Sequence, residues 1–284
     1  MKARSEELRG EGSGPRNAAP PSLPAAHRRF LAGAIEKLSR DERLVGLAAG
    51  GSYAGGTMDA FSDLDLVVAV EPPDCADVMA DRRRIAETLG TLLAAFTGEH
   101  VGEPRLLICL FDEPLLHVDL KFVALDDVAE RVEDPAVVWE RDGRVTRALA
   151  RRKATYPAPD ARWIEERYWT WVHYTAAKIG RGELFEALGC LALLREKALG
   201  PLGLARAGAR PSGVRRIEIE APGLARELRR TAAGYGAAEC LRALRACVEL
   251  YESLRAPDQP VETAARRAAL DYLSEIERAC GAAG

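Results

Sequence analysis

The sequence predicts an α/β protein of the α+β kind, with a small mixed-sheet domain followed by an all-α helical bundle domain. Two observations support this prediction. In the first half, apolar runs of strand length alternate with segments of helical spacing, whereas the apolar patterns of the second half are helical. The Pro-containing segment TYPAPD at 155–160 separates the halves. We therefore expect a disordered tail at 1–24, a mixed-sheet domain at 25–156 and a helical domain at 157–284.

The expected tail is rich in Gly, Pro and charged residues and has no hydrophobic centre. A segment of this composition buries too little apolar surface to offset the entropy of ordering, so we expect it to be disordered. The lack of an apolar centre also argues against a secretory signal.

The mixed-sheet domain is predicted from the order of its apolar patterns. They indicate a helix at 27–39, strands at 44–48 and 64–70, a helix at 80–95, and strands at 104–111 and 115–123. A short helix at 126–133 and an apolar stretch at 137–139 follow. The order helix, strand, strand, helix, strand, strand is typical of a mixed α/β block with a small sheet.

The second domain is predicted to consist of helices. Their expected ranges are 162–179, 183–199, 237–254 and 261–280. Gly200 and Pro201 are expected to end the second of these helices, and 202–211 to be a connector.

Two aspartates lie in the apolar run of the second predicted strand. Successive side chains of a strand point to opposite faces, so Asp63 and Asp65 share one face. Neighbouring carboxylates in an apolar setting repel each other and lose hydration, which is costly unless a cation neutralises them. Mg²⁺ prefers oxygen ligands and is the expected ion. A phosphate would then bind the same metal, against the backbone N–H groups near Gly51 and Ser52.

A third carboxylate, Asp119, lies in the middle of the apolar run 115–123. His117, Asp119 and Lys121 alternate onto one face of that predicted strand. If the strand lies beside the one with Asp63 and Asp65, and their polar faces are aligned, the three carboxylates converge. The alternative is that Asp119 only pairs with Lys121 or His117 at a sheet edge.

These residues carry a resemblance to a known family. The string Gly51-Ser52-x-x-x-Gly56 followed by Ser62-Asp63-Leu64-Asp65-Leu66 resembles the signature of the polymerase-beta-like nucleotidyltransferase superfamily. That superfamily includes the adenylyltransferases that inactivate aminoglycosides and lincosamides, and many small bacterial relatives. The motif covers about a tenth of the chain and identifies the chemistry better than the substrate.

The resemblance implies transfer of a nucleoside monophosphate, with AMP from ATP as the expected case and pyrophosphate as the leaving group. Two Mg²⁺ ions would be held by Asp63, Asp65 and Asp119, the last acting either as metal ligand or as general base. The nucleotide would contact a set of glycines and serines, namely Gly51, Ser52, Gly56 and Ser62. Ser52 has the alternative, compatible role of capping the following helix.

Two cations of the helical domain are candidates for binding the triphosphate. Lys178 lies near the end of the helix predicted at 162–179, and Arg195 shares a face with Leu188 and Leu191 on the next helix. The alternative for Lys178 is a solvated residue that interacts with the helix dipole. For Arg195 the alternative is an ordinary exposed position beside Glu196.

Composition narrows the class of protein. The chain has 284 residues, of which 29% are charged, and no apolar run approaches the length of a spanning helix, so we expect no membrane residence. The pI near 6.0 gives no electrostatic footprint for nucleic acid. Six cysteines without C-x-x-C spacing favour reduced thiols and a cytoplasmic protein. The histidines show no zinc-ligand spacing.

Three functions agree with these observations. The first is a nucleotidyltransferase that modifies a hydroxyl of a small polar acceptor such as an aminoglycoside-like compound. The second is a nucleotidyltransferase acting on a protein or tRNA, and the third is a nucleotide-binding sensor without turnover. The intact carboxylates favour an enzyme over a sensor. The oligomeric state stays open, because the Ala-rich C-terminal helices would permit two copies to pair.

Overall fold

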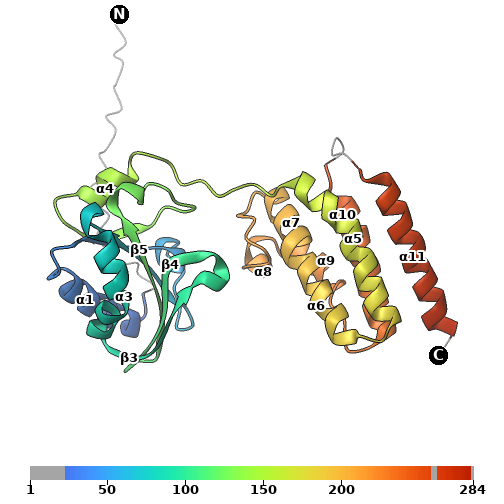
Figure 1. Cartoon of the computed structure of the whole chain (residues 1–284), viewed down its shortest axis with the longest axis horizontal. Helices are drawn as coiled ribbons and strands as arrows, with labels where there is room; N and C mark the ends of the chain where they lie inside the picture. Colours follow the sequence, from blue (N-terminus) through green and yellow to red (C-terminus); the bar gives the residue numbers. More distant parts are fainter. Residues whose placement is uncertain (1–22, 257–260, 283–284) are drawn as a thin grey trace, which may run out of the picture. The chain divides into compact units, whose positions relative to one another are not determined.

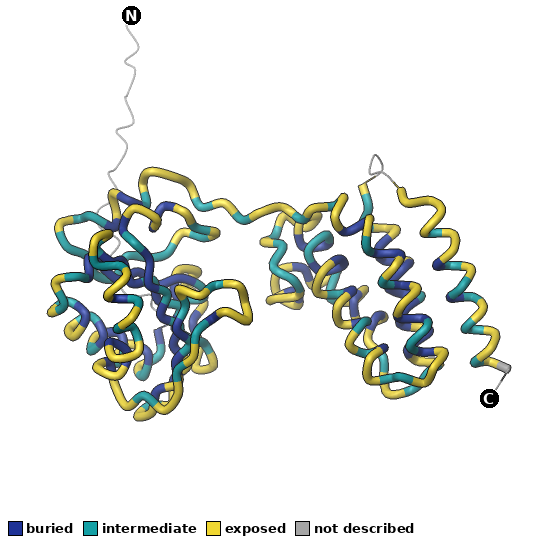
Figure 2. Tube along the Cα trace, in the orientation of Figure 1, coloured by how far each residue is buried: buried dark blue, intermediate teal, exposed yellow. Residues whose placement is uncertain are grey.

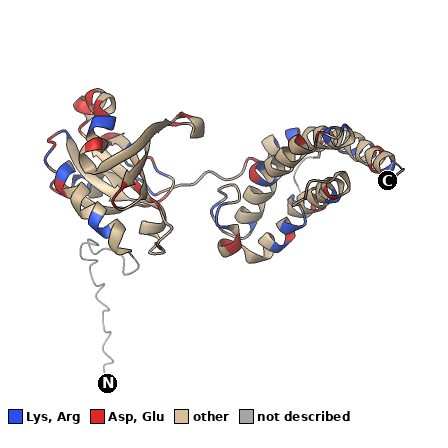
Figure 3. Cartoon of the chain, turned by 90° about the horizontal axis from the view of Figure 1, so that it is seen from below, with Lys and Arg blue, Asp and Glu red and all other residues tan. Residues whose placement is uncertain are grey.

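The computed structural model describes residues 23–256 and 261–282. The tail predicted at 1–24 lies outside the described residues except for Leu23 and Pro24, and Leu23 is buried. As described, the chain divides into two compact units, one ending at Thr155 and the other beginning at Tyr156 (Figure 1). Lys and Arg are interspersed with Asp and Glu on the described parts of both units (Figure 3).

The first unit is built on a mixed sheet, as predicted. In the described residues the sheet has six strands in the order β3-β4-β5-β2-β1-β6. The strands are β1 (Leu44–Ala49), β2 (Leu64–Val70), β3 (Thr91–Gly98), β4 (Glu103–Asp112), β5 (Leu116–Ala124) and β6 (Ala136–Glu140). The central pair β2 and β5 is parallel, whereas the neighbouring pairs are antiparallel.

The two faces of the sheet are covered differently. Helices α1 (Ala25–Leu38) and α3 (Cys75–Leu89) pack on one face, against a core that includes the inward side chains of β2 and β5. On the other face, Val67 and Val123 pack with α4 (Arg144–Leu149) over part of the sheet. Strand β1 is buried throughout and β2 is buried at most of its positions, and Figure 2 shows dark blue, buried segments in the interior of this unit. The uncovered part of the second face carries the polar residues described below.

The helix predicted at 80–95 is wrong in its last six residues. Helix α3 ends at Leu89, and residues 91–98 form the edge strand β3, paired with β4. Gly90 is fully extended and breaks the helix. Strand β3 is exposed along most of its length, so its apolar residues show no clear two-residue alternation that would distinguish a strand from a continued helix.

The second unit is helical, as predicted. Its longer helices are α5 (Ala161–Gly180), α6 (Leu184–Leu194), α10 (Ala237–Leu254) and α11 (Thr263–Ala282), which pack around a common core. Shorter helices are α7 (Gly200–Arg206), α8 (Ile217–Glu220) and α9 (Pro222–Arg229). No helix in the described ranges is long and apolar enough to cross a membrane.

The predicted helix end at Gly200 and Pro201 is also wrong. Helix α6 continues through a π-helical turn, η4 (Arg195–Leu199), directly into α7. The π turn changes the hydrogen-bond pattern at the place where a proline lacks its N–H. Residue 200 must be small, because a Cβ there would lie 2.2 Å from the carbonyl oxygen of Gly213. The glycine therefore serves close packing rather than termination.

One buried carboxylate ties the helical unit together. Glu165 of α5 is only 4% exposed. Within the described chain it accepts hydrogen bonds from the Trp169 indole (2.8 Å), the Tyr251 hydroxyl (2.6 Å), the Arg255 guanidinium (3.0 Å) and the Glu262 backbone N–H (3.0 Å). It therefore links α5 to α10 and to the segment that leads into α11.

Candidate functional site

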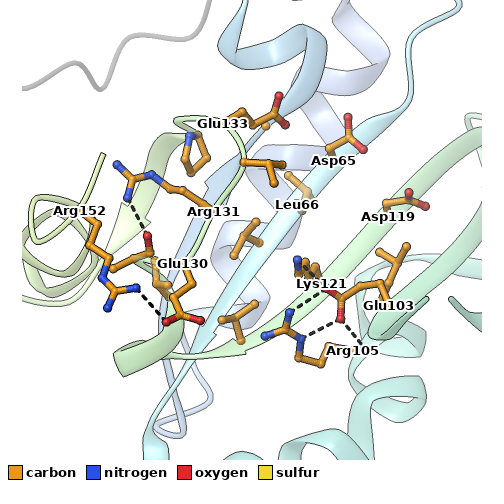
Figure 4. Close-up of a pocket in the computed structure, with 18 of the residues that line it drawn as sticks. Asp65, Leu66, Glu103, Arg105, Asp119, Lys121, Glu130, Arg131, Glu133 and Arg152 are labelled. Carbon is orange, nitrogen blue, oxygen red and sulfur yellow. Dashed lines mark hydrogen bonds and ion pairs between the residues drawn. The ribbon is translucent and has the colours of Figure 1, made fainter. Parts of the chain in front are cut away.

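Asp65 and Asp119 lie side by side in the centre of the sheet. They are register partners on the parallel strands β2 and β5, which places their backbones about 4.8 Å apart, the usual spacing of neighbouring strands. Both are half-buried. Their side chains point to the same side of the sheet in Figure 4. The structure thus brings these two predicted carboxylates together.

The local sequence explains why they face outward. In β2, Leu64 and Leu66 are buried in the core beneath α1 and α3, so the intervening Asp65 faces the opposite side. In β5, Val118 and Leu120 are buried in the same core and flank Asp119 in the same way. The alternation of apolar and polar residues therefore fixes both carboxylates on the uncovered face.

The structure places Asp63 differently. It precedes the first residue of β2, is half-buried, and does not line the pocket that contains Asp65 and Asp119. Among the described residues, no three His, Cys, Asp or Glu side chains are grouped closely enough to hold a metal ion. The part of Asp63 in a metal site thus stays a prediction.

Asp119 has the histidine as a neighbour rather than the lysine. The Nε2 atom of His117 is 3.0 Å from Oδ1 of Asp119. Lys121 instead forms an ion pair of 2.7 Å with Glu103 of β4. Asp119 lies on an inner strand, since β5 is paired on both sides. One of the two pairings weighed from the sequence is therefore present, but not at a sheet edge.

The Gly50-Gly51-Ser52 turn packs against Asp65. Gly51 has a φ of +53°, and a Cβ at this position would lie 2.0 Å from Oδ2 of Asp65. The Gly51 N–H donates to Oε1 of Glu133 at 3.0 Å, and the Gly50 N–H donates to the Asp65 carbonyl at 2.8 Å. The turn opens the short helix α2 (Gly51–Ala54), whose N-cap is Gly50, so Ser52 does not cap it. The buried Ser52 Oγ has no hydrogen-bond partner among the described residues.

The loop between α2 and β2 contains the remaining residues of the motif. Gly56 has a φ of +65°, a conformation that favours glycine. The Ser62 hydroxyl donates to Oδ1 of Asp59 and accepts from the Asp59 N–H, both at 3.0 Å. Its carbonyl is 2.7 Å from Nε2 of His27, which is 2% exposed on α1. Ser62 thus stabilises the turn that delivers the chain to Asp63.

A pocket of about 830 Å³ opens beside the acidic pair (Figure 4). Its described charged lining comprises five carboxylates and five cations, all from the first unit: Asp65, Glu103, Asp119, Glu130, Glu133, Arg105, Lys121, Arg131, Arg152 and Lys153. Val67, Val123 and Val128 contribute apolar surface. The pocket therefore suits a polar ligand of moderate size.

Glu103 holds two of these cations. Its carboxylate accepts hydrogen bonds from Arg105 at 2.8 Å and pairs with Lys121 at 2.7 Å. The hydrogen bonds from Arg105, followed by those from Lys121, lower the pKa of Glu103 to about 2 although partial burial opposes them. Across the pocket, Arg152 pairs with Glu130 at 3.0 Å.

Several residues that line this pocket could not be assigned to the site from the sequence. The sequence offers Lys121 only as a neighbour of Asp119 on the same strand face, and Glu103 and Arg105 begin β4 without any distinguishing pattern. Glu133 lies in the loop between η3 (Leu125–Asp127) and β6, where a helix was predicted for 126–133. No periodic signal marks a loop residue that folds back onto a glycine turn.

The two predicted cations of the helical unit have partners within that unit. Lys178 contacts Glu183 at 2.7 Å and Glu186 at 3.0 Å, and its ammonium lies 4.9 Å from the centre of the Tyr174 ring. These partners, Glu183 first, raise the pKa of Lys178 well above its usual value. Arg195 donates to the Thr231 carbonyl at 2.7 Å. Their contact with a nucleotide stays a prediction.

The donor set fits a hard divalent cation. Asp65 and Asp119 supply oxygen atoms on one side of the pocket, and Asp63 lies two residues before Asp65 in the chain. Mg²⁺ is bound in proteins by few carboxylates together with water and phosphate oxygens, so a pair of aspartates is sufficient protein ligation. The Asp65 carboxylate lies directly against the Gly51 backbone, so an ion held by Asp65 would lie next to this turn.

Part of the first unit matches a known protein family. Residues 31–130 match the family described as nucleotidyltransferase domain. Among solved structures, the chain is similar to an aminoglycoside 6-adenyltransferase from Bacillus subtilis, with 15% identity, 87% of this chain and 97% of that chain covered, and a TM-score of 0.37. It is also similar to a nucleotidyltransferase-like protein from Exiguobacterium sibiricum, with 14% identity, 86% and 77% covered, and a TM-score of 0.35. A search of curated proteins gave no match.

Proposed function

Because residues 31–130 form a nucleotidyltransferase domain, we propose that the enzyme transfers AMP from ATP to a hydroxyl of a small polar acceptor, such as an aminoglycoside-like compound. Pyrophosphate is the other product. The observation that carries the proposal is the register pairing of Asp65 with Asp119 beside the Gly50-Gly51 turn. Two carboxylates are thereby held next to backbone that a phosphate can approach.

Asp65 and Asp119 are proposed to hold Mg²⁺, with Asp63 as a further ligand. When bound, a pair of Mg²⁺ ions stabilises charge on the attacking and the leaving oxygen of an in-line displacement. The residues themselves contribute position. Strands β2 and β5 fix the two aspartates, and the core beneath them resists displacement of either strand.

The donor is proposed to lie along the motif loop. Ser52 supplies a hydroxyl that lacks a partner in the described structure, and the glycines at 51 and 56 allow close approach of phosphate oxygens. Ser62 keeps the turn before Asp63 in place. Lys178 and Arg195 stay candidates for binding the outer phosphates. Lys178 would have to leave its ion pair with Glu183 to do so.

The acceptor hydroxyl must lose a proton during transfer. A carboxylate within hydrogen-bond reach can take it, and Asp119 is the candidate, either directly or as a metal ligand that orients the acceptor. The contact with His117 at 3.0 Å gives Asp119 a neighbour that can share that proton. The pocket volume of about 830 Å³ and its charged lining support a small polar acceptor.

The six cysteines are free thiols in the structure, which supports the cytoplasm as the place of the reaction. We also propose that the two compact units are separate domains, the first carrying the reaction and the second contributing to substrate binding.

Calorimetric titration tests the function. ATP, GTP, CTP and UTP are titrated into wild type, Asp65→Asn and Asp119→Asn with and without Mg²⁺. We expect the wild type to bind one purine nucleotide only when Mg²⁺ is present. Both variants should lose this Mg²⁺-dependent binding. Asp77→Asn is the matched control, because Asp77 is exposed on α3, which covers the other face of the sheet. If the wild type binds none of the four nucleotides in the presence of Mg²⁺, the proposal is contradicted.

Once the donor is known, acceptors are screened by release of pyrophosphate. Aminoglycosides, other polar hydroxyl compounds, tRNA and protein substrates are tested with the wild type. Release that depends on a small acceptor supports the proposed substrate class. Release only with tRNA or protein supports the macromolecular alternative instead.

A further inference from the structure

Glu133 lies over the glycine turn that the donor is proposed to approach. Its Oε1 atom accepts the Gly51 N–H at 3.0 Å. The same atom would be 2.9 Å from a Cβ at residue 50, so the carboxylate lies directly against both glycines. In Figure 4 its side chain extends toward Asp65 at the acidic side of the pocket. A carboxylate from a distant loop is therefore in contact with the motif.

Hydrogen bonds within the loop that contains Glu133 stabilise its conformation. Arg131, two residues earlier, donates to the Ala129 carbonyl at 3.2 Å and to the Asp134 carboxylate at 2.8 Å. The Arg131 side chain is largely buried, whereas Asp134 is exposed. These contacts stay within the loop and leave the longer Glu133 side chain to reach the glycines. The position of Glu133 is thus a property of the folded loop.

A phosphate and a carboxylate compete for such a place on chemical grounds. Both are anions whose oxygens accept hydrogen bonds from backbone N–H groups, and one N–H has room for one short bond. A phosphate oxygen that approaches Gly51 would meet the negative charge of Glu133 at close range, next to that of Asp65. Binding therefore requires that the Glu133 carboxylate leave.

We infer that Glu133 is an internal competitor of the donor's phosphate group: it occupies the Gly51 N–H in the free protein and is displaced when the triphosphate binds. This inference rests on the proposed function, which brings a nucleoside triphosphate to this turn. The consequence is selectivity. A lone phosphate offers little to offset the displacement, whereas a metal-bound triphosphate makes many contacts at once.

The experiment measures nucleotide affinity in Glu133→Gln and Glu133→Asp. Glutamine keeps a neutral acceptor for the Gly51 N–H and removes the charge. Aspartate keeps the charge but is one methylene shorter, so it withdraws from the N–H. Glu130→Gln is the matched control, because Glu130 lines the same pocket but pairs with Arg152 instead of the glycines. Thermal unfolding confirms that each variant is folded.

We expect Glu133→Gln to bind ATP in the presence of Mg²⁺ about tenfold more tightly than wild type, which corresponds to about 1.4 kcal/mol. Inorganic pyrophosphate, used as a second probe without nucleobase or ribose, should gain at least as much. Glu133→Asp should gain less but in the same direction. Glu130→Gln reports the general effect of removing one negative charge from the pocket, and its gain should be clearly smaller.

Two results overturn the inference alone. In the first, wild type binds ATP while Glu133→Gln shows no gain beyond that of Glu130→Gln, which would mean that Glu133 does not compete. Alternatively, Glu133→Gln binds more weakly and needs more Mg²⁺, which would make Glu133 a metal ligand. Failure of wild type and all variants to bind any of the four nucleotides overturns the proposed function, and the inference with it.

Discussion

The carboxylate of Asp65 lies against the backbone of Gly51, so closely that a Cβ on residue 51 would come within 2.0 Å of its Oδ2 atom. Residue 51 also has a φ of +53°, in the left-handed region that side chains with a Cβ rarely adopt. Two independent constraints, one steric and one conformational, therefore require glycine here. Any larger residue must displace the aspartate, the turn or both.

Gly51→Ala should therefore damage both stability and the site. We expect the free energy of unfolding of the first unit to fall by about 1–3 kcal/mol, because a strained φ is combined with a displaced carboxylate. The Mg²⁺-dependent binding of the nucleotide should also be lost, because Asp65 is displaced. Urea denaturation and calorimetric titration measure the two effects.

Gly55→Ala is the matched control for this change. Gly55 lies in the same turn with a φ of −75°, and a Cβ there would meet its nearest neighbour at 3.6 Å, an ordinary contact. Its unfolding free energy should stay within about 0.5 kcal/mol of wild type. Equal losses of unfolding free energy in the two variants would show that any substitution in this turn is destabilising, whatever its contact with Asp65.

His27 should stabilise the loop that leads into Asp63. It is 2% exposed and its Nε2 atom lies 2.7 Å from the Ser62 carbonyl. His27→Leu removes this hydrogen bond, so the free energy of unfolding should fall by about 1–2 kcal/mol. The Mg²⁺ concentration needed for nucleotide binding should rise, because Asp63 directly follows Ser62. Denaturant unfolding and metal titration measure these changes.

His27→Gln provides the rescue, since its amide can donate at a place close to that of Nε2. It should recover most of the metal dependence, whereas Arg29→Gln, on the exposed side of the same helix, should change neither quantity. If leucine and glutamine behave alike toward Mg²⁺, the hydrogen bond to Ser62 does not position Asp63.

Glu165 should be essential for the helical unit. Glu165→Ala leaves the Arg255 guanidinium and two aromatic donors without their acceptor, so we expect a loss of about 3–5 kcal/mol in the free energy of unfolding. Tryptophan fluorescence follows this unit alone in a Trp139→Phe background, because the other three tryptophans lie in α5. Glu166→Gln, exposed on the same helix, should change the free energy by less than about 0.5 kcal/mol.

The same carboxylate should make the stability of this unit depend on pH. Burial raises the pKa of Glu165, but hydrogen bonds from Tyr251, the Glu262 N–H and Trp169, with the charge of Arg255, lower it on balance below its usual 4.5. A lowered folded-state pKa adds stability above pH 4.5 that is lost as the pH falls through the folded value. Unfolding at pH 7 and at pH 3 to 4 should show this loss in wild type.

Glu165→Gln tests the assignment, because glutamine cannot titrate. Its unfolding free energy should be lower than that of wild type at pH 7, and the difference should shrink toward acidic pH. A difference that stays constant between pH 7 and pH 3 would assign the acid sensitivity to other groups.

The acidic pair could be predicted because its pattern is local. Alternation of polar and apolar residues put Asp65 and Asp119 on strand faces, and the structure pairs those strands in register. The strand β3 was missed, because an exposed edge strand lacks the one-sided burial that creates a two-residue pattern. The continuation of α6 into α7 was missed because Gly200 and Pro201 ordinarily end helices.

Other parts of the site depend on contacts that no local pattern encodes. Glu133 reaches Gly51 from a loop, and His27 reaches Ser62 from α1, each across a long stretch of sequence. A glutamate in a loop and a histidine on a helix occur in many proteins without contacting a site, so neither could be assigned to this site from the sequence. The placement of Asp65 beside Asp119 could therefore be predicted, whereas the residues that surround them required the fold.

The parallel pairing of β2 with β5 has a consequence for how the protein acquires its site. Helix α3 and strands β3 and β4 lie between them in the chain, so joining them closes a long loop, which carries an entropic cost. Such non-local pairings form slowly compared with the β3–β4 hairpin. A chain still being synthesised has Asp65 but no partner for it until β5 emerges. The acidic pair can therefore form only after the chain has been synthesised through β5.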